Sequence, residues 1–168
     1  MNLTRSFIRK VSNRTEAGGI KKMANKLTFE SVNCGDVLPE VKEHIDQETI
    51  WKHAVGSLDY NPVHTNPEWC KTAQVFGLPV PVQHGNQTMS LMCKVITNWA
   101  YPVGGRMKRM EVKLIKPVPV GSTCTYGAAV TEKHPVGKGG GNFVTLDVWA
   151  KNQDGELVGT GIAQVYLP

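Results

Sequence analysis

The segment Asp59-Tyr60-Asn61-Pro62-Val63-His64 sets a carboxylate and an imidazole close together across an Asn-Pro pair. Proline keeps the residue before it away from helical geometry, so the segment is predicted to be a rigid turn rather than part of a helix. Such a turn can direct both side chains at one water molecule, which an acid–base pair can activate. The plainer alternative is an Asp that caps a helix beside a surface His, which is the commoner use of these residues.

Glycine at position 85 opens the longest helix that the sequence predicts, from Gly85 to Ala100. Free backbone N–H groups at a helix start favour negative charge, and glycine lets a ligand approach the backbone closely. If the Asp59 turn lies beside this start, Asp59 and His64 can hold a water while the Gly85 N–H stabilises an enolate oxygen on a thioester carbonyl. That set suits the addition of water to an activated carbon chain, or its removal.

The elements that must position these groups follow from hydrophobic spacing. We expect extended segments over 27–32 and 41–45, a helix that Asp46 caps and Gly56 ends, and a second helix from Asn66-Pro67. The helix over 85–100 is apolar on most of its circumference, which predicts that it is buried, and it contains no Asp or Glu. After Met107 the period changes to two, which predicts four strands in an antiparallel meander. The result is a single α+β domain whose sheet wraps a long central helix.

Charge divides the 168-residue chain into a basic leader, residues 1–26, and a body, residues 27–168. The net charge is +5, and the leader carries seven Lys/Arg and one acidic residue, so the body is close to neutral. The leader suits an organelle-targeting peptide, a disordered tail, or a segment upstream of a true start at Met23. A neutral body argues against nucleic-acid binding, and no apolar run is long enough to cross a membrane. We expect no metal, because the histidines do not stand at ligand spacings with other donors.

Several motifs together resemble the MaoC-like, (R)-specific enoyl-CoA hydratases (hydratase 2), which have the hotdog fold. They are the Asp59–His64 segment, Phe76-Gly77, His84-Gly85 at the start of a long helix, Lys116 to Gly121, and Gly159 to Ala163, the last two resembling the family's later strands. The resemblance spans about residues 27–168. It implies reversible addition of water to a 2-enoyl thioester of coenzyme A or acyl carrier protein in fatty acid metabolism, no cofactor, and a homodimer.

Site roles follow from the same resemblance. Asp59 and His64 match the catalytic pair, and Gly85 matches the glycine that binds the thioester carbonyl. Asn61 and His84 are expected to support them, and His84 is expected to be structural. Arg106, Lys108 and Arg109 are candidates for the phosphates of coenzyme A, with a solvated strand start as the alternative.

Five positions depart from the family pattern. Leu58 stands where a small or polar residue is usual, Asn66 replaces an acidic residue, and Cys93 replaces a serine that supports the Asp in some members. Asn86 and Gln87 stand where apolar residues are common, which predicts a more polar acyl pocket.

Two other functions remain open on the sequence. One is a non-catalytic or partner-dependent hotdog subunit that binds acyl-CoA, and the other is a hotdog acyl-CoA thioesterase. Many such thioesterases carry a carboxylate on the central helix, which residues 85–100 do not offer. The expected compartment is the cytoplasm, or the mitochondrial matrix if the leader is a transit peptide.

Overall fold

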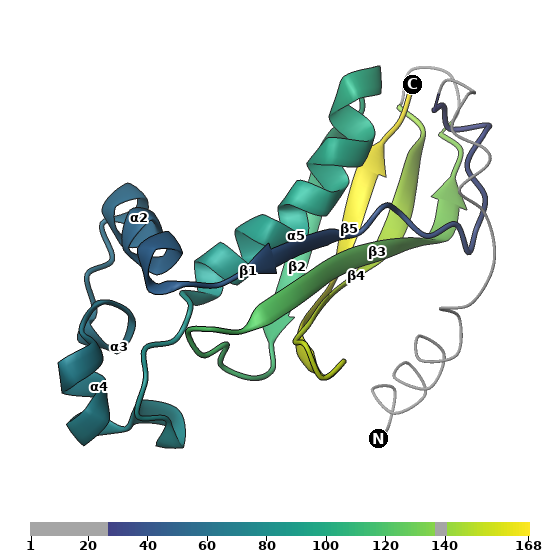
Figure 1. The fold of residues 1–168 in the computed structure, drawn as a ribbon. Helices are drawn as coiled ribbons and strands as arrows, with labels where there is room; N and C mark the ends of the chain where they lie inside the picture. Colours follow the sequence, from purple (N-terminus) through teal and green to yellow (C-terminus); the bar gives the residue numbers. More distant parts are fainter. Residues whose placement is uncertain (1–26, 137–140) are drawn as a thin grey trace.

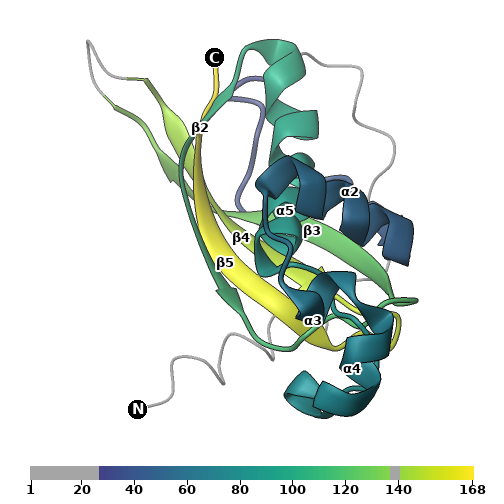
Figure 2. The ribbon, with the colours of Figure 1, turned by 90° about the vertical axis from the view of Figure 1, so that its left-hand side faces the viewer.

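The computed structural model describes residues 27–136 and 141–168, so the predictions for the basic leader lie outside the described residues. A five-stranded sheet curves around one long helix, α5 (Gly85–Ala100). Helices α2 (Gln47–Ser57), α3 (Pro62–Thr65) and α4 (Pro67–Ala73) gather at the N-terminal end of α5 (Figures 1 and 2). This is the predicted α+β arrangement, in which the sheet wraps a central helix.

The sheet contains β1 (Val41–His44), β2 (Arg106–Leu114), β3 (Thr123–His134), β4 (Phe143–Lys151) and β5 (Leu157–Tyr166) in the order β1-β3-β4-β5-β2. Every neighbouring pair is antiparallel. The predicted meander is correct for β3, β4 and β5 but wrong for β2, which pairs with β5 at the far edge. One side of β2 therefore has no strand partner within the described part of the chain.

The core lies between the concave face of the sheet and one face of α5. The inward-facing side chains of β3 and β4 are all buried, namely Cys124, Tyr126, Ala128, Val130, Val144, Leu146, Val148 and Ala150. From α5 the buried apolar residues are Met92, Val95, Ile96 and Ala100. The expectation that α5 is buried around most of its circumference is wrong, because Met89 is 43% exposed and the charged Lys94 is also exposed. Apolar spacing alone does not reveal which stripe of a helix the sheet covers.

Two segments expected to be extended are not strands. Residues 27–32 form turns, and Lys116–Gly121 is a connection with a single β-bridge between Pro119 and Val82. Prolines 117 and 119 explain the second case, because a proline removes a ladder donor. Gly159–Ala163 lies within β5, as expected. Among the described residues, no helix is both long enough and apolar enough to cross a membrane.

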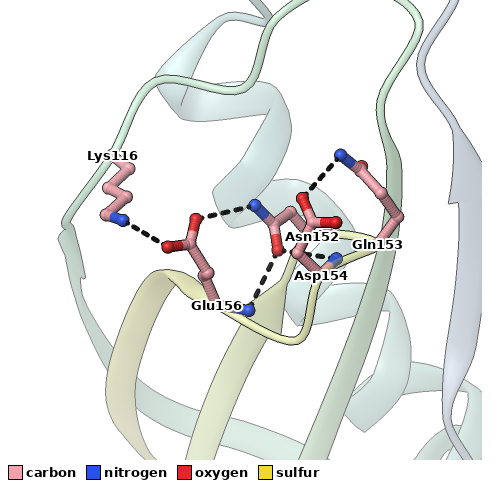
Figure 3. A network of polar contacts seen from close by, with 5 residues as sticks. All are labelled: Lys116, Asn152, Gln153, Asp154 and Glu156. Carbon is pink, nitrogen blue, oxygen red and sulfur yellow. Dashed lines mark hydrogen bonds and ion pairs between the residues drawn. The ribbon is translucent and has the colours of Figure 1, made fainter.

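A polar network fixes the Lys116–Gly121 connection to the turn between β4 and β5 (Figure 3). Lys116 Nζ donates to Glu156 Oε1 at 2.9 Å, and Asn152 Nδ2 donates to Glu156 Oε2 at 3.1 Å. Asn152 Oδ1 in turn accepts the backbone N–H groups of Asp154 and Glu156. Hydrogen bonds from Lys116 and Asn152 hold the pKa of Glu156 below its ordinary value. The network anchors the segment whose Pro119 pairs with Val82, shortly before Gly85.

Candidate active site

Helix α2 ends at Ser57, with Leu58 as its C-cap directly before Asp59, rather than at Gly56 as the sequence suggested. Asp46 caps its start by accepting the Thr49 N–H, as predicted. Leu58 has a φ of 57° and is 76% exposed. This left-handed conformation costs a residue with a Cβ about 1–2 kcal/mol, and it reverses the chain so that Asp59 follows the helix directly.

His64 lies in a short helix, so the prediction of a turn without helix is wrong. Proline can occupy the first helical position, because its missing N–H would have no partner there. Pro62 takes that position in α3, and Asn61 Oδ1 accepts the Val63 N–H as a cap. The Asn61 N–H also points to Asp59 Oδ1 at 3.3 Å. Asn61 thus starts the helix that carries His64 and contacts the carboxylate of Asp59.

Backbone contacts fix the orientation of the His64 ring. Its Nδ1 lies 2.7 Å from the carbonyl oxygen of Val82. A carbonyl can only accept, so Nδ1 carries the hydrogen and the neutral ring leaves Nε2 free to accept a proton. Gln47 Nε2 donates to the carbonyl oxygen of His64 at 2.9 Å, which ties α3 to α2.

His84 is 1% exposed and connects the Asp59 turn to the start of α5. Its Nε2–H donates to the carbonyl oxygen of Asp59 at 3.0 Å. Its ring stacks on that of His64 with centroids 3.9 Å apart. Burial, followed by the charges of His64 and His53, lowers the pKa of His84. These contacts hold the Asp59 turn and the start of α5 together, and the structural role expected of His84 stays a prediction.

The structure brings together three groups that are distant in sequence. An oxygen of Asp59, a nitrogen of His64 and a nitrogen of His84 all lie within 4.8 Å of one another. Such a set is able to ligate a metal, and the sequence spacing of the histidines did not suggest it. Imidazole lone pairs lie in the ring plane, however, and the planes of His64 and His84 differ by only 27°. Their lone pairs therefore do not converge well on one ion, and the group suits a water better.

Gly85 is the first residue of α5, directly after His84. Within the described residues its N–H has no hydrogen-bond partner, as expected in the first turn of a helix. A methyl group at position 85 would overlap Cδ1 of Leu114 at the end of β2. The backbone here is therefore close to its neighbours, and this N–H belongs to the residue that follows His84, a member of the group formed with Asp59 and His64.

The polar pair after Gly85 contacts α2. Asn86 Oδ1 lies 2.9 Å from His53 Nε2, and Gln87 Nε2 donates to the carbonyl oxygen of Thr49 at 3.4 Å. Sequence reasoning did not identify His53 or Gln47 as part of the site. The available signal was weak: His53 precedes the buried Ala54 on α2 and therefore borders the stripe that faces α5.

The basic residues at the start of β2 are not brought to this site within one chain. Leu114, at the other end of the strand, is the residue that meets Gly85, and eight residues of strand span about 27 Å. Arg106 lies over the ring of Tyr166, and Arg109 pairs with Glu111.

Lys108 and Cys93 also contact groups outside the site. Lys108 lies over the ring of Phe143, and Cys93 Sγ contacts Met110 Sδ at 3.2 Å.

Comparison with known proteins gives a family and several structural neighbours. A family model described as "MaoC like domain" matches residues 29–150. R-hydratase PhaJ1 from Pseudomonas aeruginosa is 24% identical with a TM-score of 0.74, covering 85% of this chain and 86% of that one. An (R)-hydratase from A. caviae involved in PHA biosynthesis is 25% identical with a TM-score of 0.71, covering 83% and 99%. The ChsH1-ChsH2 complex from Mycobacterium tuberculosis is 24% identical with a TM-score of 0.67, and the match covers 81% of this chain and 98% of that one. The search of curated proteins found no match.

Proposed function

The chain belongs to the MaoC-like dehydratase family, and from that premise we propose that it is an (R)-specific 2-enoyl-CoA hydratase. In reverse the same site is a 3-hydroxyacyl-thioester dehydratase. One observation carries the proposal: the Asp59 carboxylate and the His64 ring, with Nε2 free, converge on His84, and the N–H of the next residue, Gly85, has no partner among the described residues. The (R)-hydratase neighbours support the choice of reaction and its stereochemistry.

The mechanism follows from the roles of these groups. A water held between Asp59 and His64 Nε2 loses a proton to the pair as its oxygen bonds to C3 of the enoyl thioester. The electrons of the double bond move to the thioester carbonyl, and the Gly85 N–H stabilises the enolate oxygen. The pair then returns a proton to C2, so that H and OH of one water have been added across the double bond. The reaction needs no redox cofactor, and we propose that it needs no metal.

A homodimer is part of the proposal because, in the described part of the chain, β2 leaves one edge of the sheet without a strand partner. An unpaired edge strand is a surface on which a second strand can pair. Leu114 and Ile115, at the end of β2, are 47% and 45% exposed. Antiparallel pairing of β2 with its copy would bring the partner's basic Arg106 end to the side of the sheet that carries Leu114. A cation near this edge could meet the phosphates, which the pantetheine arm of coenzyme A holds away from the thioester.

Purified protein and a panel of 2-enoyl-CoA esters of different chain length test the function. Loss of the enoyl absorbance with formation of the (3R)-hydroxyacyl product is expected. Failure to hydrate any ester by a chain shown to be dimeric would reject the catalytic proposal.

A second candidate is a subunit that is active only with a different chain. The neighbour made of ChsH1 and ChsH2 is a complex of two proteins, which favours this alternative. Gel filtration with activity measurement on the lone chain distinguishes the two, because a partner-dependent subunit has no turnover by itself. Thioesterase activity is the weaker alternative, since α5 has no carboxylate, and a free-thiol reagent detects it.

A further inference from the structure

The first turn of α5 meets polar groups from α2 beside His84, which belongs to the Asp59 group. His53 Nε2 is 2.9 Å from Asn86 Oδ1, and the His53 ring centroid is 4.9 Å from that of His84. Figures 1 and 2 both draw α2 beside the N-terminal end of α5. One wall beside the Asp59 group is therefore made of hydrogen-bonding side chains.

Two atoms on this wall are buried and lack a partner within the described residues. Gln87 is 6% exposed, and its amide must turn its NH2 toward the Thr49 carbonyl, which leaves Oε1 as an unpaired acceptor. His84 uses Nε2–H for the Asp59 carbonyl, which leaves Nδ1 as a second unpaired acceptor. Buried polar atoms are nearly always hydrogen-bonded, so each of them calls for a donor from a ligand or a water.

The side of the site that faces β2 is apolar rather than polar. Toward β2 the side chain that contacts Gly85 is apolar, namely Leu114, which is 47% exposed. A saturated acyl tail would lose hydrogen bonds on the α2 side without gaining apolar contact there. The polar wall therefore selects among acyl groups, whereas the apolar side cannot distinguish a hydroxyl from a methyl group strongly.

We propose that this site prefers 2-enoyl thioesters whose acyl group carries a hydroxyl, held by Gln87 and by the His53–Asn86 pair. The inference rests on the proposed hydratase function. The hydroxyl donates to the buried Gln87 Oε1. It accepts from Nδ2 of the exposed Asn86, because Asn86 Oδ1 faces His53 and no hydrogen bond within the described residues uses Nδ2. A carboxylate fits less well because Gln87 Oε1 and His84 Nδ1 both offer lone pairs. The nearby cation of α2, Lys52, is exposed and paired with Glu48.

The test compares two CoA esters of similar shape, 5-hydroxypent-2-enoyl-CoA and hex-2-enoyl-CoA, with glutaconyl-CoA as the carboxylate. We expect kcat/KM for the hydroxyl ester to exceed that for the methyl ester by at least about tenfold, because a site built to bind a hydroxyl rejects an analogue without it. The glutaconyl ester should be the poorest. Gln87→Leu, and separately His53→Phe with Asn86→Leu, should lower the hydroxyl-to-methyl ratio about tenfold. Ser90→Ala, on the next turn of α5, is the matched control and should keep the ratio.

A wild-type ratio of one or less, or a ratio that these variants leave unchanged, would overturn the preference while the hydratase function stands. If Gln87→Leu does not fold, Gln87→Met replaces it. If no ester is hydrated at all, the proposed function fails instead. Calorimetric binding of the two esters to Asp59→Asn then still decides the preference, because it gives a ratio of Kd values without turnover.

Discussion

The imidazole rings of His64 and His84 stack with centroids 3.9 Å apart and planes inclined by 27°. A positive charge on the His64 ring opposes one on His84 at that separation, which disfavours protonation of His84. His84 is also the more deeply buried ring, which lowers its pKa. The fold therefore favours a neutral His84 under the ring that is expected to act as the base.

Stability should fall as the pH falls through the ordinary pKa of histidine. Because the pKa of His84 is lower in the folded chain than its ordinary 6.5, the unfolded chain takes up this proton first. Stability then decreases below about pH 6.5, by at most about 1.4 kcal/mol per pH unit for this group. His84→Gln keeps a donor for the Asp59 carbonyl but cannot titrate. The free energy of unfolding, measured with denaturant at pH 7.5 and at pH 5.5, should decrease more in the wild type than in His84→Gln. Equal decreases in the two proteins would contradict the assignment of this pH dependence to His84.

Removal of either member of the acid–base pair should abolish most turnover without unfolding the chain. Asp59→Asn and His64→Gln are each expected to lower kcat by about 10²–10⁴-fold, the usual contribution of a positioned acid or base. Asp36→Asn and His134→Gln alter the same residue types elsewhere in the fold and should keep the wild-type rate. Rates within about threefold of wild type in both site variants, measured on folded protein, would remove the pair from the mechanism.

Substitutions at Gly85 and at its neighbour Leu114 can show whether the glycine is required by the ligand or by packing. Gly85→Ala would push its methyl group into Leu114 and crowd the N–H beside the thioester, so kcat should fall by about 10²-fold, as when one oxyanion donor is lost. Adding Leu114→Ala removes the clash inside the chain. If the glycine serves the ligand, the double variant should recover thermal stability but not kcat. Recovery of both would show that packing alone requires the glycine.

The sequence predicted α5 to the residue, because a strong apolar period, a glycine start and a change of period after the helix all agreed. It also predicted the helix starts at Asp46 and Asn66, where a side chain caps the first turn. Local rules were sufficient for these elements. They failed for α3, because proline is compatible with both a turn and a first helical position.

Tertiary placement accounts for the remaining errors. The position of β2 beside β5 depends on a connection that crosses the sheet, and no local pattern encodes that choice. The contact of His53 with Asn86 joins residues far apart in the sequence, so no motif spacing could reveal it. The Asp59–His64 pair was found because both residues lie in one short segment.

Leu58 offers a gain in stability at the edge of the site. It adopts a φ of 57° and is 76% exposed, so its side chain contributes little packing while the backbone is in a conformation that favours glycine. Leu58→Gly should raise the free energy of unfolding by up to about 1 kcal/mol, since relief of the left-handed conformation outweighs the added freedom of the unfolded chain. Leu58→Ala keeps a Cβ and is the matched control, which should show no gain. A loss of stability in the glycine variant would mean that the exposed leucine packs on something in solution, such as a second copy.

Metal removal should leave the activity intact, although Asp59, His64 and His84 lie within 4.8 Å of one another. The two rings are nearly parallel, and His84 Nε2 and His64 Nδ1 are already used by carbonyl groups. Dialysis against a chelator is therefore expected to change kcat/KM by less than about twofold, well below the contribution of an acid or base. Added Zn²⁺ should instead inhibit, because it competes with protons and water for Asp59 and His64 Nε2. A loss of activity on chelation that zinc restores would make the three residues a metal centre, and Asp59 and His64 would then be ligands rather than an acid–base pair.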